Sequence, residues 1–263
     1  MYSASKKLLL ALGLPLALSF NSAQAVEETV SLQTRDGVAL NFRLLSSKNP
    51  VANVILFAGG KGKIGVKDWG IKKTGNFLVR SRELFLGKGL DVAVIDAPSD
   101  KKDEDGMFYG FRTSLEHVAD VNAVIDYLRT RNNKPVWLVG TSRGTESVAH
   151  IAINTTKKID GVVFTASITE KNGKGRAVTE MDLSKISVPV LISSHKKDHC
   201  DITPPRGAKK IKKKLTSSPR IEIKMYTGGN KPVSKPCKAK SQHGFYGIEN
   251  EVVNDIVEFI KNS

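Results

Sequence analysis

Cysteine is scarce in this sequence of 263 residues, which contains only Cys200 and Cys237. The two are too far apart for a C-x-x-C motif, so a thioredoxin-like redox site is excluded. Beyond residue 25, no apolar run is long enough to cross a bilayer, and no internal repeat or low-complexity linker is present. Neither a zinc-ligand pattern nor an aromatic-interleaved recognition sheet occurs, so no specific nucleic-acid module is predicted.

Acidic residues are also in short supply. The chain has 26 Asp and Glu against 41 Lys and Arg, and its formal net charge is +15 at pH 7. A protein this basic is expected to make electrostatic contact with anionic surfaces, such as envelope polyanions or anionic lipid. The densest basic cluster, Lys209 to Lys214, is interpreted as a solvated helix face.

The first 25 residues differ in kind from the rest. Lys6 and Lys7 precede an apolar run from Leu8 to Phe20, and Ala23-Gln24-Ala25 follows. A basic segment, an apolar segment and an A-x-A site in this order are typical of a secretory signal peptide, whereas the run is short for a membrane anchor. We expect residues 1–25 to be removed, which leaves a net charge of about +13 on a periplasmic or secreted protein.

The two cysteines fit that compartment. In an oxidising environment, a lone pair of cysteines is more often a disulfide than two free thiols. We therefore expect a bridge between Cys200 and Cys237, and we expect no metal site there.

Residues 26–263 are long enough for one globular domain with a proper core. Two alternating stretches, residues 29–34 and 38–44, flank Asp36-Gly37 and predict a β-hairpin. Continuous apolar runs predict strands that are covered on both faces. These runs are residues 54–57, 92–95, 136–139, 162–164 and 188–192, and residues 220–225 predict a last strand.

Helical periodicity falls between these runs and at the end of the chain, over residues 115–128, 148–153 and 252–260, and the middle helix should begin beside Ser142. Strands that alternate with helices predict an α/β fold, here a three-layer α/β/α sandwich. Its mostly parallel sheet should have about eight strands and an antiparallel N-terminal hairpin. The connection from Ser167 to Ser187 is too short for a large cap domain, so we expect an open site.

The strongest chemical signal is the segment Gly140-Thr141-Ser142-Arg143-Gly144, where a buried strand runs directly into a helix. A G-x-S-x-G pattern at such a turn is typical of a nucleophile elbow, because the sharp turn exposes the serine hydroxyl above the sheet. The pattern predicts Ser142 as a nucleophile.

A nucleophilic serine needs a base and an acid that orients the base. His243 lies in a polar loop between the last strand and the final helix, which is the position of the base in this topology. Asp198 follows the strand at residues 188–192 and is our predicted acid, with Asp201 as the second choice. His117 and His150 fall within helical patterns and are interpreted as structural or surface residues.

His195 and His199 are spaced four residues apart, a spacing that can bind a metal on a helix. They follow a strand, in a loop that does not hold helical geometry. We therefore predict no metal site.

Acyl transfer also needs amide donors for the developing oxyanion. Arg143, directly after the serine, supplies one. The glycine-rich loop that begins at Ala58 supplies the other, from Gly60 or Lys61. This loop lacks the spacing of a phosphate-binding P-loop.

Together, these residues resemble the α/β-hydrolase superfamily over nearly all of residues 26–263. The chain order Ser142, Asp198, His243 is the order of that superfamily, and the sequence looks most like capless bacterial hydrolases related to dienelactone hydrolases and prolyl-oligopeptidase-type domains. The resemblance implies hydrolysis of an ester, thioester or amide without a cofactor. Two positions depart from it: Ala58 stands where the lipase-type motif has histidine, and Arg143 places a long cation beside the serine.

In this setting, a Cys200–Cys237 bridge would tie the acid loop to the base loop. Arg143 would either meet an acidic substrate group or point along its helix into solvent, and we favour the second. The side chains expected to shape specificity are Trp69, Phe77, Met107, Tyr109 and Phe111.

Three functions follow from this reading. The first is an exported serine esterase, acting as a monomer on a small-molecule or acyl substrate. The second is a serine peptidase on the same fold. The third is a non-enzymatic protein that binds envelope polyanions on a hydrolase scaffold.

Overall fold

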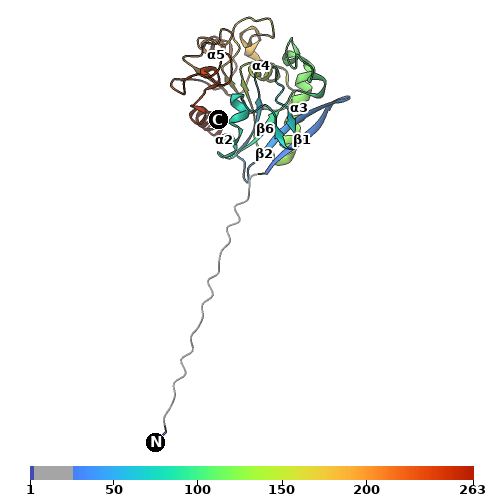
Figure 1. The fold of residues 1–263 in the computed structure, drawn as a ribbon. Coiled ribbons are helices and arrows are strands. Elements are labelled where there is room, and N and C mark those ends of the chain that lie inside the picture. The colour runs from blue at the N-terminus through green and yellow to red at the C-terminus, as the bar shows by residue number, and fades with distance from the viewer. Residues whose placement is uncertain (3–25) are drawn as a thin grey trace.

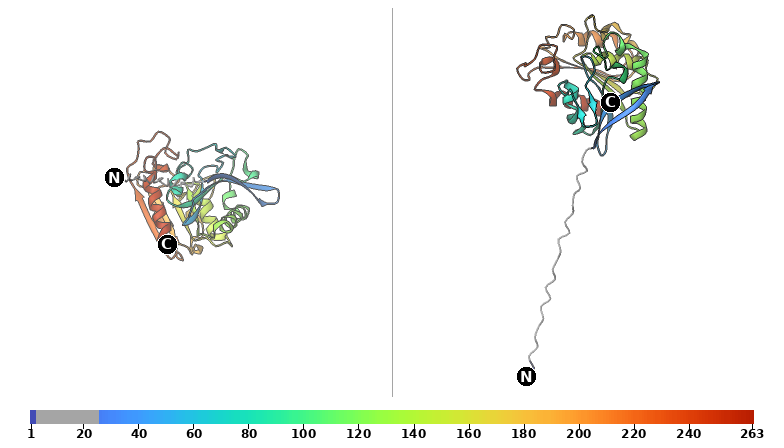
Figure 2. Two further views of the ribbon diagram at one scale, coloured as in Figure 1. Left: turned by 90° about the horizontal axis from the view of Figure 1, so that it is seen from below. Right: turned by 45° about the vertical axis from the view of Figure 1, so that its right-hand side comes forward.

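A computed structural model describes residues 1–2 and 26–263. The predicted signal peptide, residues 1–25, therefore lies almost entirely outside the described residues. The described chain forms a central sheet with helices on both faces, which confirms the predicted three-layer α/β arrangement (Figures 1 and 2).

The central sheet has eight strands in the order β1-β2-β6-β3-β7-β8-β9-β10, as predicted in number. Their bounds are β1 Val26–Arg35, β2 Val38–Ser46, β3 Ala52–Phe57, β6 Leu90–Ile95, β7 Val136–Thr141, β8 Gly161–Thr165, β9 Val190–His195 and β10 Ile221–Tyr226. A separate two-stranded ribbon pairs β4 Val66–Lys67 with β5 Gly70–Ile71.

The predicted hairpin is confirmed, since β1 pairs antiparallel with β2 around Asp36-Gly37. Gly37 has a φ of +64°, a conformation that glycine adopts without steric cost. Strand β2 then pairs antiparallel with β6, and every other neighbouring pair of the large sheet is parallel. The blue hairpin projects from one edge of the sheet (Figure 1).

The interior strands are buried on both faces, which explains their continuous apolar sequences. Every residue of β3, β6, β7, β8 and β9 is buried. The outer strand β10 is only half-buried, because one of its edges has no neighbour in the sheet.

Helices cover the two faces with separate apolar cores. One face carries α3 Leu115–Asn132, α4 Gly144–Asn154 and α5 Gly207–Lys214. The other carries α1 Phe77–Arg80, α2 Arg82–Leu86 and α6 Glu249–Lys261. Short 3-10 turns complete the chain: η1 Ser99–Lys101, η2 Phe111–Thr113, η3 Val178–Glu180, η4 Leu183–Lys185 and η5 Gln242–Gly244.

The connection between β8 and β9 contains only η3 and η4, and no further domain is inserted there. Among the described residues, no helix combines the length and apolarity needed to span a membrane. The loops that follow β3, β7 and β9 leave from the same edge of the sheet, because these strands are parallel. That edge is where the candidate residues gather.

Candidate active site

Ser142 lies on the sharp turn between β7 and α4, with a φ of +53°. A non-glycine residue in this left-handed region is strained by roughly 1–2 kcal/mol, so the surrounding structure must hold it. The Ser142 amide donates to the Thr165 carbonyl at 3.0 Å, and its carbonyl accepts from the Thr145 amide at 2.9 Å and the Thr145 hydroxyl at 2.6 Å. These bonds fix the turn between β8 and the first turn of α4.

The glycines around Ser142 stand where a side chain would clash with neighbouring atoms. A Cβ on Gly144 would lie 2.1 Å from the Phe57 carbonyl oxygen, and one on Gly140 would lie 2.6 Å from the Gly144 carbonyl oxygen. A Cβ on Gly59 would lie 2.9 Å from Cβ of Ser142. The backbones of β3, the elbow and α4 therefore pass against one another with no room for a side chain.

The structure brings Asp198 and His243 together. His243 Nδ1 lies 3.0 Å from Asp198 Oδ2, and both side chains are buried. Because Nδ1 is occupied by the carboxylate, the other ring nitrogen, Nε2, remains for a second partner. Asp201, the second choice for the acid, is exposed instead.

Thr203 is a member of this cluster that sequence reasoning missed. Its hydroxyl oxygen lies 2.9 Å from Asp198 Oδ2 and 3.0 Å from His243 Nδ1, and the residue is 1% exposed. The hydroxyl donates to the carboxylate, and its lone pair faces the ring N–H. A threonine five residues after an aspartate carries no recognisable sequence signal.

A disulfide joins Cys200 and Cys237, as predicted. The Cys200 amide donates to Asp198 Oδ1 at 2.9 Å, so the same residue holds the carboxylate and carries the bridge. Cys237 belongs to the segment that leads to His243, and its side chain lines the hollow beside that imidazole. The bridge thus ties the loop of Asp198 to the loop of His243.

Three of the other four histidines hold structural positions, whereas His199 is exposed. His195 is buried, accepts from the Lys197 amide at Nδ1 (3.0 Å) and faces the Gly228 carbonyl with Nε2 (3.1 Å). Burial lowers the pKa of His195. Burial also lowers the pKa of His117 to about 3, so that ring is neutral in the core. His150 is hydrogen-bonded to Asn154, one turn later on α4.

The loop after β3 passes directly over Ser142 and supplies amides that are not otherwise used. Among residues 26–263, the amides of Gly60, Lys61 and Arg143 donate no hydrogen bond. These three are the amides that the sequence pointed to. Gly60 has a φ of +60°, and Gly62 closes the loop by donating to the Gly59 carbonyl at 3.2 Å.

The Arg112 side chain holds that loop through hydrogen bonds to its carbonyls. The sequence analysis did not identify this residue. The side chain is fully buried; its Nη2 donates to the carbonyls of Ala58 (3.0 Å) and Gly60 (3.1 Å) and its Nη1 to the Ser147 hydroxyl (2.8 Å). Because C=O and N–H of a trans peptide point in opposite directions, holding the Gly60 carbonyl aims the Lys61 amide away from Arg112. Burial lowers the pKa of Arg112 to about 10, so it remains a cation near neutral pH.

Arg143 does not follow our sequence-based preference for a solvent-exposed side chain. It is only 6% exposed, and its Nη1 binds Glu146 at 2.8 Å while its Nη2 donates to Asn172 at 2.5 Å. Its guanidinium also lies over the Phe108 ring, 5.2 Å from the centroid. Burial raises the pKa of Glu146, and the nearby guanidinium groups of Arg112 and Arg143 oppose that shift. The Arg143–Glu146 ion pair lies inside the fold. Each buried charge is compensated by the other, because an unpaired buried charge would be costly.

Ser142 and His243 line the same small hollow, which has a volume of about 60 Å³. Its walls come from the loop after β3, from α1, from the elbow and from the segment before His243. They contain no carboxylate, and the lining residues are Gly59, Gly60, Asn76, Phe77, Thr141, Ser142, Cys237, Ala239, His243 and Gly244.

Of the five side chains expected to shape specificity, Phe77 alone lines this hollow. Trp69 is exposed at the turn of the β4–β5 ribbon, and Met107 is buried under Gly62. Tyr109 and Phe111 line a different depression.

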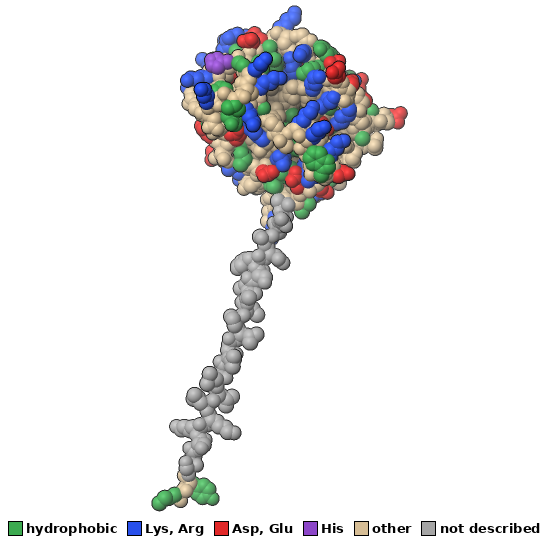
Figure 3. Space-filling view, in the orientation of Figure 1, with side chains coloured by type: hydrophobic (Ala, Val, Ile, Leu, Met, Phe, Trp, Pro, Cys, Tyr) green, Lys and Arg blue, Asp and Glu red, His purple; other side chains and the backbone are tan. Residues whose placement is uncertain are grey.

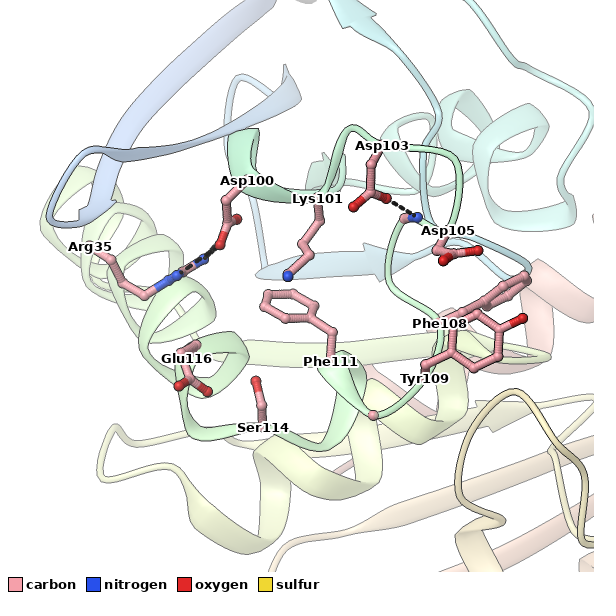
Figure 4. A pocket seen from close by; sticks show the side chains of 12 residues that line it. Arg35, Asp100, Lys101, Asp103, Asp105, Phe108, Tyr109, Phe111, Ser114 and Glu116 are labelled. Atoms are coloured by element: carbon pink, nitrogen blue, oxygen red, sulfur yellow. Dashed lines mark hydrogen bonds and ion pairs between the residues drawn. The ribbon is translucent and has the colours of Figure 1, made fainter.

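That second depression, of about 590 Å³, is open and mixed in charge. Figure 4 shows Arg35 paired with Asp100, and Lys101 placed over the Phe111 ring. Arg35 and Asp100 are the only two of its charged lining residues that pair with each other, and neither Ser142 nor His243 is among its lining residues. In the described part of the chain, no group of three or more His, Cys, Asp or Glu residues is arranged to hold a metal ion.

Replacing Arg112 by methionine should destabilise the fold. The substitution leaves the Ala58 and Gly60 carbonyls and the Ser147 hydroxyl without their buried donor, at a cost of about 2–4 kcal/mol in the free energy of unfolding. Urea unfolding measures the change. The matched control, Arg206→Met, removes an exposed ion pair with Glu170 and should cost no more than about 0.5 kcal/mol. Equal stabilities of the two variants would contradict the role given to Arg112.

Solved structures with a similar fold come from several organisms. The esterase Pf2001 of Pyrococcus furiosus has a TM-score of 0.66 and 13% identity, over 90% of this chain and 91% of that one. A serine hydrolase homologue from Coxiella burnetii has a TM-score of 0.61 and 16% identity, over 88% and 96% of the two chains. Est1E from Butyrivibrio proteoclasticus has a TM-score of 0.60 and 16% identity, over 89% and 97%.

No protein-family model and no curated protein matches the sequence. At identities this low, the similarity establishes the fold and not the reaction, because one fold can carry many different activities. The described chain has the α/β-hydrolase fold, with a mixed eight-stranded sheet that begins in an antiparallel hairpin.

Proposed function

We propose that this chain is an exported serine hydrolase that cleaves a carboxylic ester through Ser142, His243 and Asp198. The observation that carries the proposal is the Asp198–His243 hydrogen bond at 3.0 Å, with His243 and Ser142 lining one hollow. An ordered acid and base beside a strained serine is the arrangement that serine acyl transfer requires.

The proposed reaction proceeds in two stages. In the first, the Ser142 hydroxyl attacks the ester carbonyl while His243 Nε2 takes its proton, and the oxyanion is bound by the amides of Arg143 and of Gly60 or Lys61. His243 then gives that proton to the departing alkoxide, which leaves an acyl-enzyme. In the second stage, water attacks the acyl-enzyme with His243 as base, and the carboxylic acid leaves.

Asp198 and Thr203 support the base in this scheme. Asp198 accepts from Nδ1 and holds the ring so that Nε2 faces the serine side, and it stabilises the imidazolium that forms. Thr203 donates to the same carboxylate oxygen and keeps it in place. The residues supply acid, base, nucleophile and oxyanion donors among themselves, so the scheme needs no cofactor.

Export is proposed from the sequence pattern of residues 1–25 and is supported by the Cys200–Cys237 disulfide. Disulfides persist in oxidising compartments, such as the periplasm and the extracellular space, and are rare in the cytosol. Cell fractionation combined with N-terminal sequencing tests this: an intact N-terminus in a cytosolic fraction contradicts it.

Ser142→Ala should abolish labelling by a fluorophosphonate, because the reagent forms a covalent bond with an activated serine oxygen. The matched control is Ser167→Ala, which removes another buried hydroxyl near the elbow that makes no hydrogen bond among residues 26–263. In-gel fluorescence should show label on the wild type and on the control. An unlabelled wild type would favour a binding protein without turnover, and cleavage of short peptides in place of aryl esters would favour a peptidase.

Thr203→Val should lower kcat by about tenfold or more with little change in KM, because it removes one hydrogen bond to a buried charged carboxylate. Thr203→Ser keeps the hydroxyl and should restore most of the rate. Steady-state kinetics on an aryl acetate separates kcat from KM. Equal rates for the valine and serine variants would show that the hydroxyl is not used.

Reducing the disulfide should lower both stability and activity. The bridge spans 37 residues, and its loss should cost about 3–4 kcal/mol in the chain-entropy model. Turnover should fall because the loops of Asp198 and His243 lose their covalent link. Activity measured after thiol titration has verified reduction provides the test, and unchanged turnover would refute the coupling. The Cys200→Ser/Cys237→Ser variant is the control, since it should not respond to reductant.

A further inference from the structure

The hollow beside Ser142 admits only a small group. Its volume of about 60 Å³ holds a few water-sized groups at roughly 10–15 Å³ each. An acetyl-sized group matches this volume, and a longer acyl chain would have to extend beyond it. Most of any larger substrate must therefore lie outside the hollow, across its rim.

The alcohol part of the substrate belongs on the His243 side of the rim. In the proposed reaction, His243 gives its proton to the departing oxygen, so that oxygen must lie within hydrogen-bond reach of the imidazole. The wall beside His243 is formed by Cys237 and Ala239. These residues belong to the segment 227–241, which links β10 to η5.

That segment is basic and contains no acidic residue. It carries Lys231, Lys235, Lys238 and Lys240, all exposed, and none of them forms an ion pair with any other residue in the described part of the chain. Lys238 and Lys240 are the chain neighbours of Ala239, which lines the hollow, although neither lysine is itself a lining residue. The face seen in Figure 3 displays many Lys and Arg side chains and comparatively few acidic ones.

The segment is also held in one shape. The Val233 amide donates to the Lys240 carbonyl at 3.0 Å, and the Lys238 amide donates to the Lys235 carbonyl at 2.9 Å. The Ser241 hydroxyl lies 2.8 Å from the Lys238 carbonyl, and the disulfide anchors Cys237. The fixed backbone anchors the stems of Lys238 and Lys240 beside Ala239, while their ammonium groups can still turn on flexible side chains.

We propose that the substrate is a short-chain acyl ester whose alcohol part carries a negative charge, and that Lys238 and Lys240 recognise that charge. The proposal rests on the ester hydrolysis proposed above and adds the substrate class. The hollow selects the acyl group by size, and the lysines select the alcohol by charge. A carboxylate, sulfate or phosphate on a free or polymeric alcohol provides the same chemistry.

The test compares 3-acetoxybenzoate with 3-acetoxybenzamide, which have the same acyl group and differ in the charge of the alcohol. Each kcat/KM is divided by the rate constant for hydroxide hydrolysis of that ester, to remove intrinsic reactivity. At low ionic strength, the anionic ester should be preferred by about fivefold or more, and the preference should shrink toward one in about 0.5 M NaCl because salt screens exposed charges.

Lys238→Gln/Lys240→Gln should bring the preference close to one. The matched control, Lys212→Gln/Lys213→Gln, removes the same charge from the exposed face of α5, away from the rim, and should keep the preference. Because the readout is a ratio, a general loss of activity in either variant does not imitate the effect. A second series, from acetyl to hexanoyl esters, should show kcat/KM falling as the acyl chain outgrows the hollow of about 60 Å³.

Two outcomes overturn the inference while the proposed function stands. One is cleavage of both acetyl esters with no preference for the anion, and the other is a preference that survives in Lys238→Gln/Lys240→Gln. If the wild type cleaves neither ester and Ser142 is not labelled by a fluorophosphonate, the proposed function has failed and the inference fails with it.

Discussion

The close approach of three backbone segments at Ser142 is the constraint on which the candidate site depends. Phe57 of β3 almost touches Gly144 of α4, and Gly59 passes over the serine at a distance that excludes any side chain. This contact holds Ser142 in a left-handed conformation that it would not adopt in an unconstrained chain. It also delivers the amides of the loop after β3 to the side of the serine where an oxyanion would form. The proposed nucleophile and the proposed oxyanion donors are therefore positioned by the same packing contact.

The electrostatics of the site are divided between an internal part and an external part. Arg112 and Arg143 are buried near Glu146. Arg112 donates to the backbone of the loop after β3, and Arg143 forms an ion pair with Glu146 beside the elbow. Their charge is used within the fold and is not offered to a ligand. The lysines of the segment before His243 are exposed and form no ion pair with the described residues. The cation next to the serine in the sequence is thus structural, while the lysines that flank Ala239, a residue of the hollow, are exposed to solvent.

Much of the fold could be predicted from the sequence, because strands buried on both faces are continuous apolar runs and their helices keep a clear period. The short elements α1, α2 and the β4–β5 ribbon could not, since two to five residues are too few to show a period. In the candidate site, Asp198 and His243 could be predicted because each follows the end of a predicted strand in the expected chain order. Arg112 and Thr203 were not, because a buried arginine in a short turn and a threonine in a loop have no pattern until tertiary contacts exist. For Arg143, the sequence contains the partner Glu146 three residues later, but the burial of the pair and the contacts with Phe108 and Asn172 depend on tertiary structure.

The covalent bridge has a consequence for how this protein can evolve. Cys237 is adjacent to Lys238 in the sequence, and the Cys200 amide donates to Asp198. The disulfide therefore links the lysines proposed to recognise the alcohol to the aspartate proposed to orient the base. A change that shifts one loop is transmitted to the other through two sulfur atoms. Selectivity and turnover should therefore drift together in homologous chains that keep the bridge, and become separable traits in those that lose it.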